Sequence, residues 1–546
     1  MNILLTHGYL LKGTGSNLYV ANLVKEMCAD GHNVFLVCQE YNPMDLDFVE
    51  DLYKFNLDNT VAEHIAHQET PYKGKCKCFI PNLNGFLPVY VYDHYDGFTV
   101  KEFPNCTDQE VQNYIDYNVT ALNVILKTYS EITVLQTNHT VMFPYIATQV
   151  DNFENYKHYM TVHGSALNFT VKKDKRFVEY ARVGLEGSDE ILVDSKHAEV
   201  ELLAFLDDYN YQHLKERVLI IPAGVDVENF LLLEEGKKES IQHFVDTIQE
   251  RLKDNKGRTK EISQKLLGID FPNNVSEVEK IVKSVREGYD YRHTDIDIDV
   301  KIKTIDSENE RIVLFIGKYL WTKGIYLILL AIPQILKENP STRFVFVGFG
   351  PFREVAEVIL NCLATKNITL LKRLVKESSL FHYEENTPYP LIAEILDVHG
   401  AEIQKTVEQL DINILDKVIF TGIVEHKQLK YLLPCADVLI APSVFPEAFG
   451  MVAIEAMACG VSPTLTYQSA FLEISDEVKE SIKQFPIDLY NVTLDENASK
   501  HIGLNVSNYL SLQEKLIQDG KLIEYKNTLR NVVVQNYSWK GIMKSY

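Results

Sequence analysis

The chain has 546 residues, of which 46% are hydrophobic and 24% charged, and its formal net charge at pH 7 is −22. A chain of this length exceeds one hydrophobic core, so two α/β domains with an insertion are expected. The negative balance argues against nucleic-acid binding and against adhesion to an anionic membrane by overall charge. No apolar run reaches the ~18 residues of a membrane-spanning helix. Residues 1–7 lack the basic start of a signal peptide, so a cytoplasmic protein is expected.

The first predicted elements follow the order strand, glycine-containing loop, helix and strand. Residues 1–6 form an apolar strand, 7–16 the loop, 17–29 the helix and 33–38 the next strand. This order is one βαβ unit of a doubly wound sheet. The pattern continues with a helix near residues 108–129 and with strands at 133–136, 159–162, 190–193 and 218–222. We therefore expect residues 1–230 to form an N-terminal Rossmann-like domain.

A charged segment with helical periodicity, residues 231–310, follows as an insertion or linker. A second doubly wound domain is expected over residues 311–520, interrupted by a polar insertion at about 370–414, and a terminal helix over 521–546. Its predicted elements are strand 312–316, loop 317–324, helix 325–337, strand 343–347, loop 348–352, strand 417–420, helix 427–433 and strand 437–443. Two consecutive domains of this kind imply that they face each other across a cleft that holds the ligands.

Two features could suggest a metal site. The eight cysteines show neither a zinc-binding spacing nor a disulfide framework. The segment Asp295-Ile296-Asp297-Ile298-Asp299 looks like an Asp-x-Asp metal motif, but its alternation favours an exposed strand outside the domain-forming units. No metal and no cofactor are therefore expected.

Two carboxylates, Glu447 and Glu455, flank a helix start that directly follows a buried strand. The amides of a helix start suit an anionic group, and ionised carboxylates accept hydrogen bonds from hydroxyls. Phosphate flanked by hydroxyls describes a nucleotide sugar. The alternative is an ordinary amphipathic helix with both glutamates in solvent. The position after a strand favours a binding site, because ligands of open α/β sheets collect at the carboxyl ends of strands.

Two further strand-to-helix loops have the character of phosphate sites. Gly15 and Ser16 belong to a loop whose glycines allow a tight turn before a helix. Lys318 and Lys323 lie on the loop 317–324, where cations would stabilise a diphosphate leaving group. His163 follows a strand of the first domain and could hydrogen-bond a transferred sugar, although capping or packing is an equally good reading of a single histidine. His7 and His139 are weaker candidates of the same kind.

On these residues the chain resembles retaining GT-B glycosyltransferases of the family 4 type, with Glu447 and Glu455 as the Glu-x7-Glu signature. Further matches lie in the family's order outside the two insertions. They are the glycine loop 13–16, Thr161-Val162-His163-Gly164, Ile221-Pro222-Ala223-Gly224-Val225-Asp226, the loop 318–324, Val347-Gly348-Phe349-Gly350-Pro351 and Phe420-Thr421-Gly422.

The resemblance implies transfer of a hexosyl group from a UDP-, GDP- or ADP-sugar, with retention of configuration and no required metal. Lys318 and Lys323 would neutralise the diphosphate, Glu455 would bind the ribose hydroxyls and Glu447 would hold the donor sugar. The other donor-binding residues implied in this domain are Phe449, Gly450, Met451 and Val452.

In the N-terminal, acceptor-side domain, His163 would contact the donor sugar near the reacting carbon, and Gly15 with Ser16 would line the diphosphate and acceptor side. The resemblance further implies that the leaving phosphate helps to deprotonate the acceptor, and that the terminal helix crosses back to the first domain. Lys318, Lys323, His163 and Glu447 are thus the expected catalytic residues. The acceptor would be a sugar, a sugar phosphate or a lipid-linked sugar in carbohydrate biosynthesis, and a homo-oligomer is possible.

The sequence departs from the family at several positions. Lys318 stands where arginine is frequent, which keeps the charge but loses the bidentate fork. Gln468-Ser469-Ala470 replaces a glycine-rich turn, and the insertion 231–310 is unusually long. Two other functions stay open: a nucleotide-sugar sensor or scaffold, which would bind donor without turning it over, and a nucleotide-sugar epimerase, which would need no acceptor.

Overall fold

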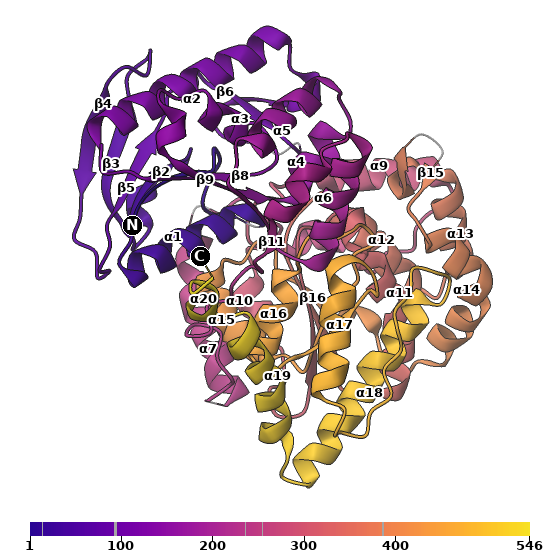
Figure 1. Cartoon of the computed structure of the whole chain (residues 1–546). Coiled ribbons are helices and arrows are strands. Elements are labelled where there is room, and N and C mark those ends of the chain that lie inside the picture. Colours follow the sequence, from indigo (N-terminus) through magenta and orange to yellow (C-terminus); the bar gives the residue numbers. More distant parts are fainter. Residues whose placement is uncertain (14, 92–94, 235, 254, 385–386, 546) are drawn as a thin grey trace. The chain divides into compact units, whose positions relative to one another are not determined.

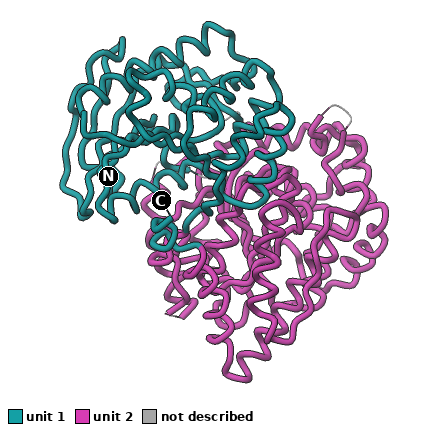
Figure 2. The backbone as a smooth tube through the Cα atoms, in the orientation of Figure 1, with its two compact units in different colours: residues 1–224, 537–546 teal, residues 225–536 magenta. Residues whose placement is uncertain are grey.

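A computed structural model of the chain describes residues 1–13, 15–91, 95–234, 236–253, 255–384 and 387–545 (Figure 1). Thr14 of the predicted glycine loop and Tyr546 lie outside the described residues. The chain divides into two compact units: unit 1 comprises residues 1–224 with 537–546, and unit 2 comprises residues 225–536 (Figure 2). Each unit is built on its own largely parallel sheet. The predicted fold class, two doubly wound α/β domains with helical insertions, is confirmed.

The central strands of the unit 1 sheet are parallel and buried. β1 lies between β2 and β8, so that Leu4 pairs with Phe35 on one side and Leu135 on the other. Near-continuous hydrophobic runs are expected of strands that are covered on both faces. Within the described residues the order of the sheet is β11 (Val218–Ile220), β10 (Glu190–Val193), β9 (Lys157–Val162), β8 (Val134–Asn138), β1 (Asn2–Thr6), β2 (Asn33–Val37), β5 (Cys76–Ile80), β3 (Val49–Phe55) and β4 (Ala62–His67).

The edge formed by β5, β3 and β4 is not predicted by the sequence. β3 and β4 are antiparallel to each other, and β4 is almost entirely solvent-accessible at the edge of the sheet (Figure 1). Charged residues on β3 form ion pairs with its neighbours, as Asp51 does with Lys77 at 2.6 Å between Oδ2 and Nζ. A strand of this composition lacks the apolar run or clean alternation by which strands are found.

Helices and a short second sheet complete unit 1. α2 begins with a capping box in which Thr107 and Glu110 each accept the backbone N–H of the other. α1 contacts β2, whereas α3 contacts both α2 and α5 (Figure 1). The helices are α1 (Ser16–Asp30), α2 (Asp108–Thr128), α3 (Phe143–Thr148), α4 (Gly164–Ala166), α5 (Arg176–Glu186), α6 (Lys196–Asp208) and α20 (Trp539–Ile542), and the small sheet pairs β6 (Phe86–Val89) with β7 (Thr99–Glu102).

The unit 2 sheet repeats this construction. β12 lies between β13 and β17, and the pairs of the sheet are parallel. α11 is buried almost all round because α12, α14 and α18 contact it. In the described part of unit 2 the sheet order is β16 (Val418–Phe420), β13 (Thr342–Val347), β12 (Arg311–Ile316), β17 (Val438–Ala441) and β18 (Ser462–Leu465), beside a hairpin of β14 (His382–Glu384) and β15 (Thr387–Pro388).

Thirteen helices complete the described part of unit 2 (Figure 1). In the described ranges none of the chain's helices is both long enough and apolar enough to span a bilayer. The helices of unit 2 are α7 (Lys237–Ile248), α8 (Lys260–Gln264), α9 (Val275–Arg286), α10 (Ile298–Lys303), α11 (Ile325–Glu338), α12 (Arg353–Ala364), α13 (Ile368–Glu377), α14 (Ile392–Gln409), α15 (His426–Leu432), α16 (Met451–Ala458), α17 (Ser469–Ser481), α18 (Ala498–Gln518) and α19 (Leu522–Asn536).

The segment 231–310 contributes α7 to α10 and is joined to α12 by buried charges. Arg258 is fully buried, donates to Glu354 over 3.0 Å and is paired with Glu357. Arg353 of α12 donates to Glu357 over 2.9 Å and to Asp295 over 3.1 Å. These five side chains form what we term the buried charge cluster. An arginine that is buried to this extent is stable only with such partners.

The prediction of an exposed strand at residues 295–299 is wrong. Asp295 is 2% exposed and pairs with Arg353 and with Lys301, and Ile298 begins α10. Burial alone would raise the pKa of Asp295, but the charges of Arg353 and Lys301 outweigh burial and lower it. The alternation of Asp and Ile is therefore not that of an exposed strand, because Asp295 is buried with Arg353, a partner far away in the sequence.

The C-terminal residues of unit 1 pack on Gly224. A Cβ atom at Gly224 would lie 2.2 Å from Cδ2 of Trp539, whose ring is also 5.8 Å from that of Tyr19. We expect Gly224→Ala to destabilise unit 1 by about 1–3 kcal/mol, because the added methyl group displaces the indole. With Trp321→Phe as background, Trp539 is the remaining tryptophan, and its emission in native buffer should move to longer wavelength.

A double-mutant cycle identifies the cause of that destabilisation. Urea unfolding followed by circular dichroism should show a smaller cost of Gly224→Ala when Trp539→Ala is already present. Equal costs in both backgrounds would show that contact with the indole is not the reason for the glycine.

Candidate functional site

The predicted donor residues of unit 2 lie where the order of its sheet reverses. β12 is followed along the chain by β13 on one side, and β17 lies on its other side. The loops after β12 and β17 therefore meet at the carboxyl edge of adjacent parallel strands. In open α/β sheets this switch point is the place where ligands bind.

Lys323 and Glu447 meet at this switch point. Nζ of Lys323 donates to Oε1 of Glu447, which also accepts the hydroxyl of Ser443. The side chains are 33% and 19% exposed, so both are open to solvent and to a ligand. The backbone N–H of Glu447 donates to Oγ of Ser469 over 3.0 Å. An ammonium group and a carboxylate are thus fixed side by side at the carboxyl edge.

Glycine allows the two loops to approach each other this closely. Gly324 has φ +65°, and a Cβ atom there would lie 2.0 Å from the carbonyl oxygen of Pro442. The N–H of Val444 donates to the carbonyl of Thr322 over 2.9 Å. The backbone of one loop therefore lies against the other, and this contact brings Lys323 to Glu447.

The helix start between the two glutamates has the predicted form. Gly450 caps α16 with φ +100° and without a side-chain cap, and a Cβ there would lie 2.4 Å from the ring of Phe471. Phe449 is buried, whereas Met451 and Val452 in the first turn are partly exposed. Gly450 has no side chain with which to cap the first amides of this helix, and amides at such a position can bind an anionic group.

Glu455 has a partner that the sequence does not predict. His426, the first residue of α15, lies 2.9 Å from Oε1 of Glu455 through Nε2, and the glutamate side chain is 7% exposed. Burial would lower the pKa of His426, but the charge of Glu455 outweighs burial and raises it. The imidazole therefore fixes one carboxylate oxygen. The one sequence signal for a role of His426 is its position at the start of a helix that follows a strand.

Lys318 lies apart from this pair, on the first turn of the same loop. Its Nζ is 5.9 Å from the centre of the Phe349 ring, in the loop after β13. The loop after β12 and the loop after β13 are in close contact, because a Cβ atom at Gly348 would lie 1.8 Å from the carbonyl oxygen of Gly317. Lys318 therefore faces the loop after β13, and Lys323 the loop after β17.

In unit 1, three histidines follow three neighbouring strands of the sheet. His7 follows β1, His139 follows β8 and His163 follows β9. Their rings lie 5.6 Å apart for His7 and His139, and 4.9 Å apart for His139 and His163. Nevertheless, among the residues that the structure describes, no group of three or more His, Cys, Asp or Glu side chains is placed to hold a metal ion.

Burial keeps these imidazoles neutral at pH 7. It lowers the pKa of His163 to about 3 and that of His7 to about 4, and it lowers the pKa of His139 well below the ordinary value. Nε2 of His163 is 3.1 Å from Oδ1 of Asn138, whose amide donates to the carbonyl of Thr6 over 3.0 Å. Since Oδ1 of Asn138 is an acceptor, Nε2 of His163 carries the proton and Nδ1 is an acceptor.

The glycine loop of unit 1 also has the predicted form in its described residues. Gly15 has φ +63° and is the cap of α1. In the described part of the chain, no atom beyond Gly15 itself and its two neighbours lies within 4 Å of the position of a Cβ there. Ser16 begins α1 and is partly exposed. The loop is fixed from the next strand by Glu40, which accepts the N–H of Leu11 over 2.9 Å. The sequence analysis misses Glu40, whose role depends on tertiary contacts.

The basic run 172–176 would suit a phosphorylated acceptor by its charge, but neighbouring carboxylates neutralise part of it. Lys172 pairs with Glu201 at 2.8 Å, and Arg176 with Asp108 at 2.6 Å and Asp174 at 2.7 Å. Two of its cations thus already have carboxylate partners. This run is therefore an unfavourable site for a phosphorylated acceptor.

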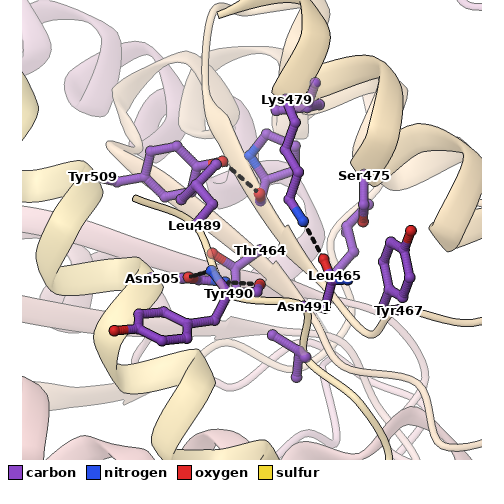
Figure 3. Close-up of a pocket in the computed structure, with 13 residues that line it drawn as sticks. Thr464, Leu465, Tyr467, Ser475, Lys479, Leu489, Tyr490, Asn491, Asn505 and Tyr509 are labelled. Atoms are coloured by element: carbon purple, nitrogen blue, oxygen red, sulfur yellow. Dashed lines mark hydrogen bonds between the residues drawn. The ribbon is translucent and has the colours of Figure 1, made fainter. Parts of the chain in front are cut away.

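One cavity of unit 2 lies away from the predicted donor residues. It is formed between β18, α17, the segment 489–492 and α18, and its volume of about 20 Å³ suits a single water molecule (Figure 3). Lys479 donates to Asn491 across it, and the amide of Asn505 donates to the carbonyl of Tyr490 over 3.0 Å (Figure 3). Its size and these internal bonds make it part of the packing.

Part of unit 2 is similar to a known family of proteins. Residues 396–488, which include Glu447 to Glu455, match the family model described as glycosyl transferases group 1. An uncharacterized glycosyltransferase of Methanocaldococcus jannaschii is 25% identical over 238 residues. That match spans 43% of this chain and 44% of the archaeal protein, less than half of either.

Solved structures share the whole fold at low identity. Sucrose-phosphate synthase from Thermosynechococcus elongatus has a TM-score of 0.51 at 14% identity, with 100% of this chain and 96% of that chain covered. An E. coli structure titled trehalose-6-phosphate, bound with UDP-2-fluoro glucose, has a TM-score of 0.50 at 11% identity, with 100% and 98% covered. The fold is therefore that of GT-B glycosyltransferases, as the resemblance predicts.

Proposed function

We propose that this chain, of which residues 396–488 match the glycosyl transferases group 1 family model, is a retaining glycosyltransferase. It moves a hexosyl group from a nucleoside diphosphate sugar to an acceptor. The observation that carries this proposal is the pair of Lys323 and Glu447 beside the start of α16, at the switch point of the unit 2 sheet.

The chemistry of these groups fits the two ends of a donor. Lys323 and Lys318 supply positive charge for the diphosphate, whose negative charge grows as the glycosidic bond breaks. Glu447 accepts hydrogen bonds from hydroxyls of the transferred sugar, and the amides of Phe449, Gly450 and Met451 bind beside it. Because two lysines supply the cationic charge, the reaction that we propose needs no metal ion.

Glu455 binds the ribose in this proposal. An ionised carboxylate has two oxygens and about four lone-pair positions, of which His426 occupies one through Nε2. The remaining positions suit the two neighbouring hydroxyls of a ribose. The paired imidazole also orients the carboxylate.

Unit 1 contributes His163, Gly15 and Ser16 in this proposal. The neutral imidazole of His163 offers an acceptor at Nδ1 to a hydroxyl of the transferred sugar, and the open space at Gly15 admits an anionic group at the start of α1. No second carboxylate is assigned as a nucleophile. Retention then follows from attack on the same face, with the leaving phosphate as the base for the acceptor hydroxyl.

The test is a thermal-shift screen of the full chain with UDP, GDP, ADP and their glucose and mannose conjugates. A ligand at about 100 times its dissociation constant stabilises a protein by about 2.7 kcal/mol. We expect one nucleotide series to raise the melting temperature, and UDP is the first candidate because the E. coli structure of this fold binds UDP-2-fluoro glucose. Adenosine and free glucose at equal concentration are the matched controls.

The same screen separates the alternatives. A transferase releases the nucleoside diphosphate slowly from its donor without an acceptor, and faster when an acceptor is added. A sensor or scaffold shows the shift without release, and an epimerase yields the isomeric nucleotide sugar. Failure of every nucleotide to shift the melting temperature would contradict the proposal.

A further inference from the structure

A second, larger cavity lies in unit 1, away from every residue to which the proposed function gives a role. Its volume is about 230 Å³. Two exposed amides, Asn84 and Asn113, reach it from the surface, so it is open to a ligand. Its lining comes from the segment before β6 and from the first three turns of α2 and consists of Leu83, Asn84, Phe86, Glu110, Asn113, Tyr114 and Tyr117.

The lining combines aromatic rings with hydroxyl-binding groups. Phe86, Tyr114 and Tyr117 offer ring surface, while Glu110 and two amides offer acceptors and donors. A sugar ring has apolar C–H faces and a rim of hydroxyls, and thus needs both kinds of group. The volume lies below the ~300–1,000 Å³ typical of drug-sized ligands, and therefore suits one sugar ring better than a nucleotide.

The charge of the cavity favours an uncharged ligand. Glu110 is the only ionisable carboxylate of the lining, and it pairs with Lys101 at 2.7 Å. The bond to Lys101 and the backbone bond of the capping box lower the pKa of Glu110, so it is ionised at pH 7. A phosphorylated ligand would bring negative charge to this carboxylate.

The cavity lies at the carboxyl ends of the strands of the unit 1 sheet, as His7 does. α2 leads back to the start of β8, so its first turns lie at the carboxyl edge of the strands. A Cβ atom at Gly8, directly after His7, would lie 3.1 Å from the hydroxyl of Tyr114. Tyr9 donates to the carbonyl of Pro88 in β6 over 3.0 Å. Tyr114 of the lining and strand β6 therefore lie next to the loop that follows β1.

From these observations we infer that this cavity is a binding site for an uncharged sugar ring, with Tyr117 as the ring that packs on its C–H face. As the acceptor subsite of the enzyme it rests on the proposed transferase function. That the cavity binds a sugar is inferred from its lining residues and does not depend on the transferase function. Glu110 and Asn113 bind the hydroxyls, and the ionised Glu110 disfavours sugar phosphates.

Saturation-transfer NMR on the full chain tests this inference with methyl α-D-glucopyranoside, methyl α-D-mannopyranoside and methyl β-D-galactopyranoside as probes. We expect at least one probe to receive saturation mainly on the C–H protons of one ring face, and the signal to persist with saturating UDP. Tyr117→Ala should weaken binding by about three- to ten-fold, the effect of an aromatic contact of about 0.5–1.5 kcal/mol. Tyr117→Phe should keep it.

Tyr72→Ala is the matched control, because Tyr72 precedes β5 at the opposite edge of the sheet and bonds to Asp47 over 2.7 Å. It should leave the signal unchanged, and all variants should keep the melting temperature of the parent chain. Equal binding by Tyr117→Ala and the parent, a signal that UDP abolishes, or no signal from any probe would overturn the inference. A nucleotide shift without sugar binding leaves the transferase proposal standing, whereas sugar binding without a nucleotide shift refutes that proposal alone.

Discussion

Replacement of Lys323 by alanine is expected to slow donor turnover by about 100- to 1,000-fold, the usual effect of removing one group that stabilises developing charge in a transition state. Lys323 is the cation that the structure fixes beside Glu447. Because the charge of the leaving diphosphate grows as the bond breaks, the loss should fall mainly on kcat. The measurement is release of nucleoside diphosphate from the donor selected by the thermal-shift screen, without acceptor.

Two further variants define the role of Lys323. Lys337→Ala, at the exposed end of α11, removes a lysine of unit 2 away from the site and should leave turnover unchanged. Glu447→Ala should also slow turnover, because the carboxylate holds the transferred sugar in the proposed site. If Lys323→Ala and Glu447→Ala release diphosphate as fast as the parent chain, the site assignment is wrong.

Replacement of Arg258 by methionine should cost unit 2 about 3–5 kcal/mol of its free energy of unfolding. Removal of one partner from a buried ion pair leaves uncompensated charge in the interior. Glu354 and Glu357 are 1% and 0% exposed and would lose the guanidinium between them. With Trp539→Phe as background, Trp321 is the remaining tryptophan, and its fluorescence during urea unfolding reports on unit 2.

The control for Arg258 comes from the same segment. Arg292 is 40% exposed and pairs with Asp290 at 2.8 Å, and Arg292→Met should change stability by less than about 1 kcal/mol. The further change Glu357→Gln should recover part of the loss in Arg258→Met, because it removes one buried charge. A loss no larger than that of Arg292→Met would contradict the importance of the buried charge cluster.

The sequence predicts the central strands of both sheets because they are apolar runs between turn signals. β1 and β12 are examples, and each is buried. β4 escapes prediction because an edge strand with polar partners does not need an apolar face. β3 is buried, but charged residues such as Asp51 interrupt its apolar pattern. The prediction of an exposed strand at residues 295–299 fails for a related reason. Asp295 is paired with Arg353, which is 58 residues away in the sequence.

The candidate site shows the same division. Loops that follow strands can be read from the sequence, and Lys323 and Glu447, which lie on two such loops, meet in the structure. The bond between His426 and Glu455 spans 29 residues, and no local pattern indicates it. The cavity beside Tyr117 depends on how β6 packs against α2, and packing of this kind has no periodic signal.

The buried charge cluster also sets the smallest piece of the chain that could fold as a nucleotide-binding fragment. A fragment cut at Arg311, where the first strand of the second sheet begins, would lack Arg258 and Asp295. Glu354 and Glu357 would then lose Arg258, and Arg353 would lose Asp295. A fragment of residues 225–536 keeps them all. The long segment before β12 is therefore an integral part of the core of unit 2, and truncated versions of this protein should begin before it.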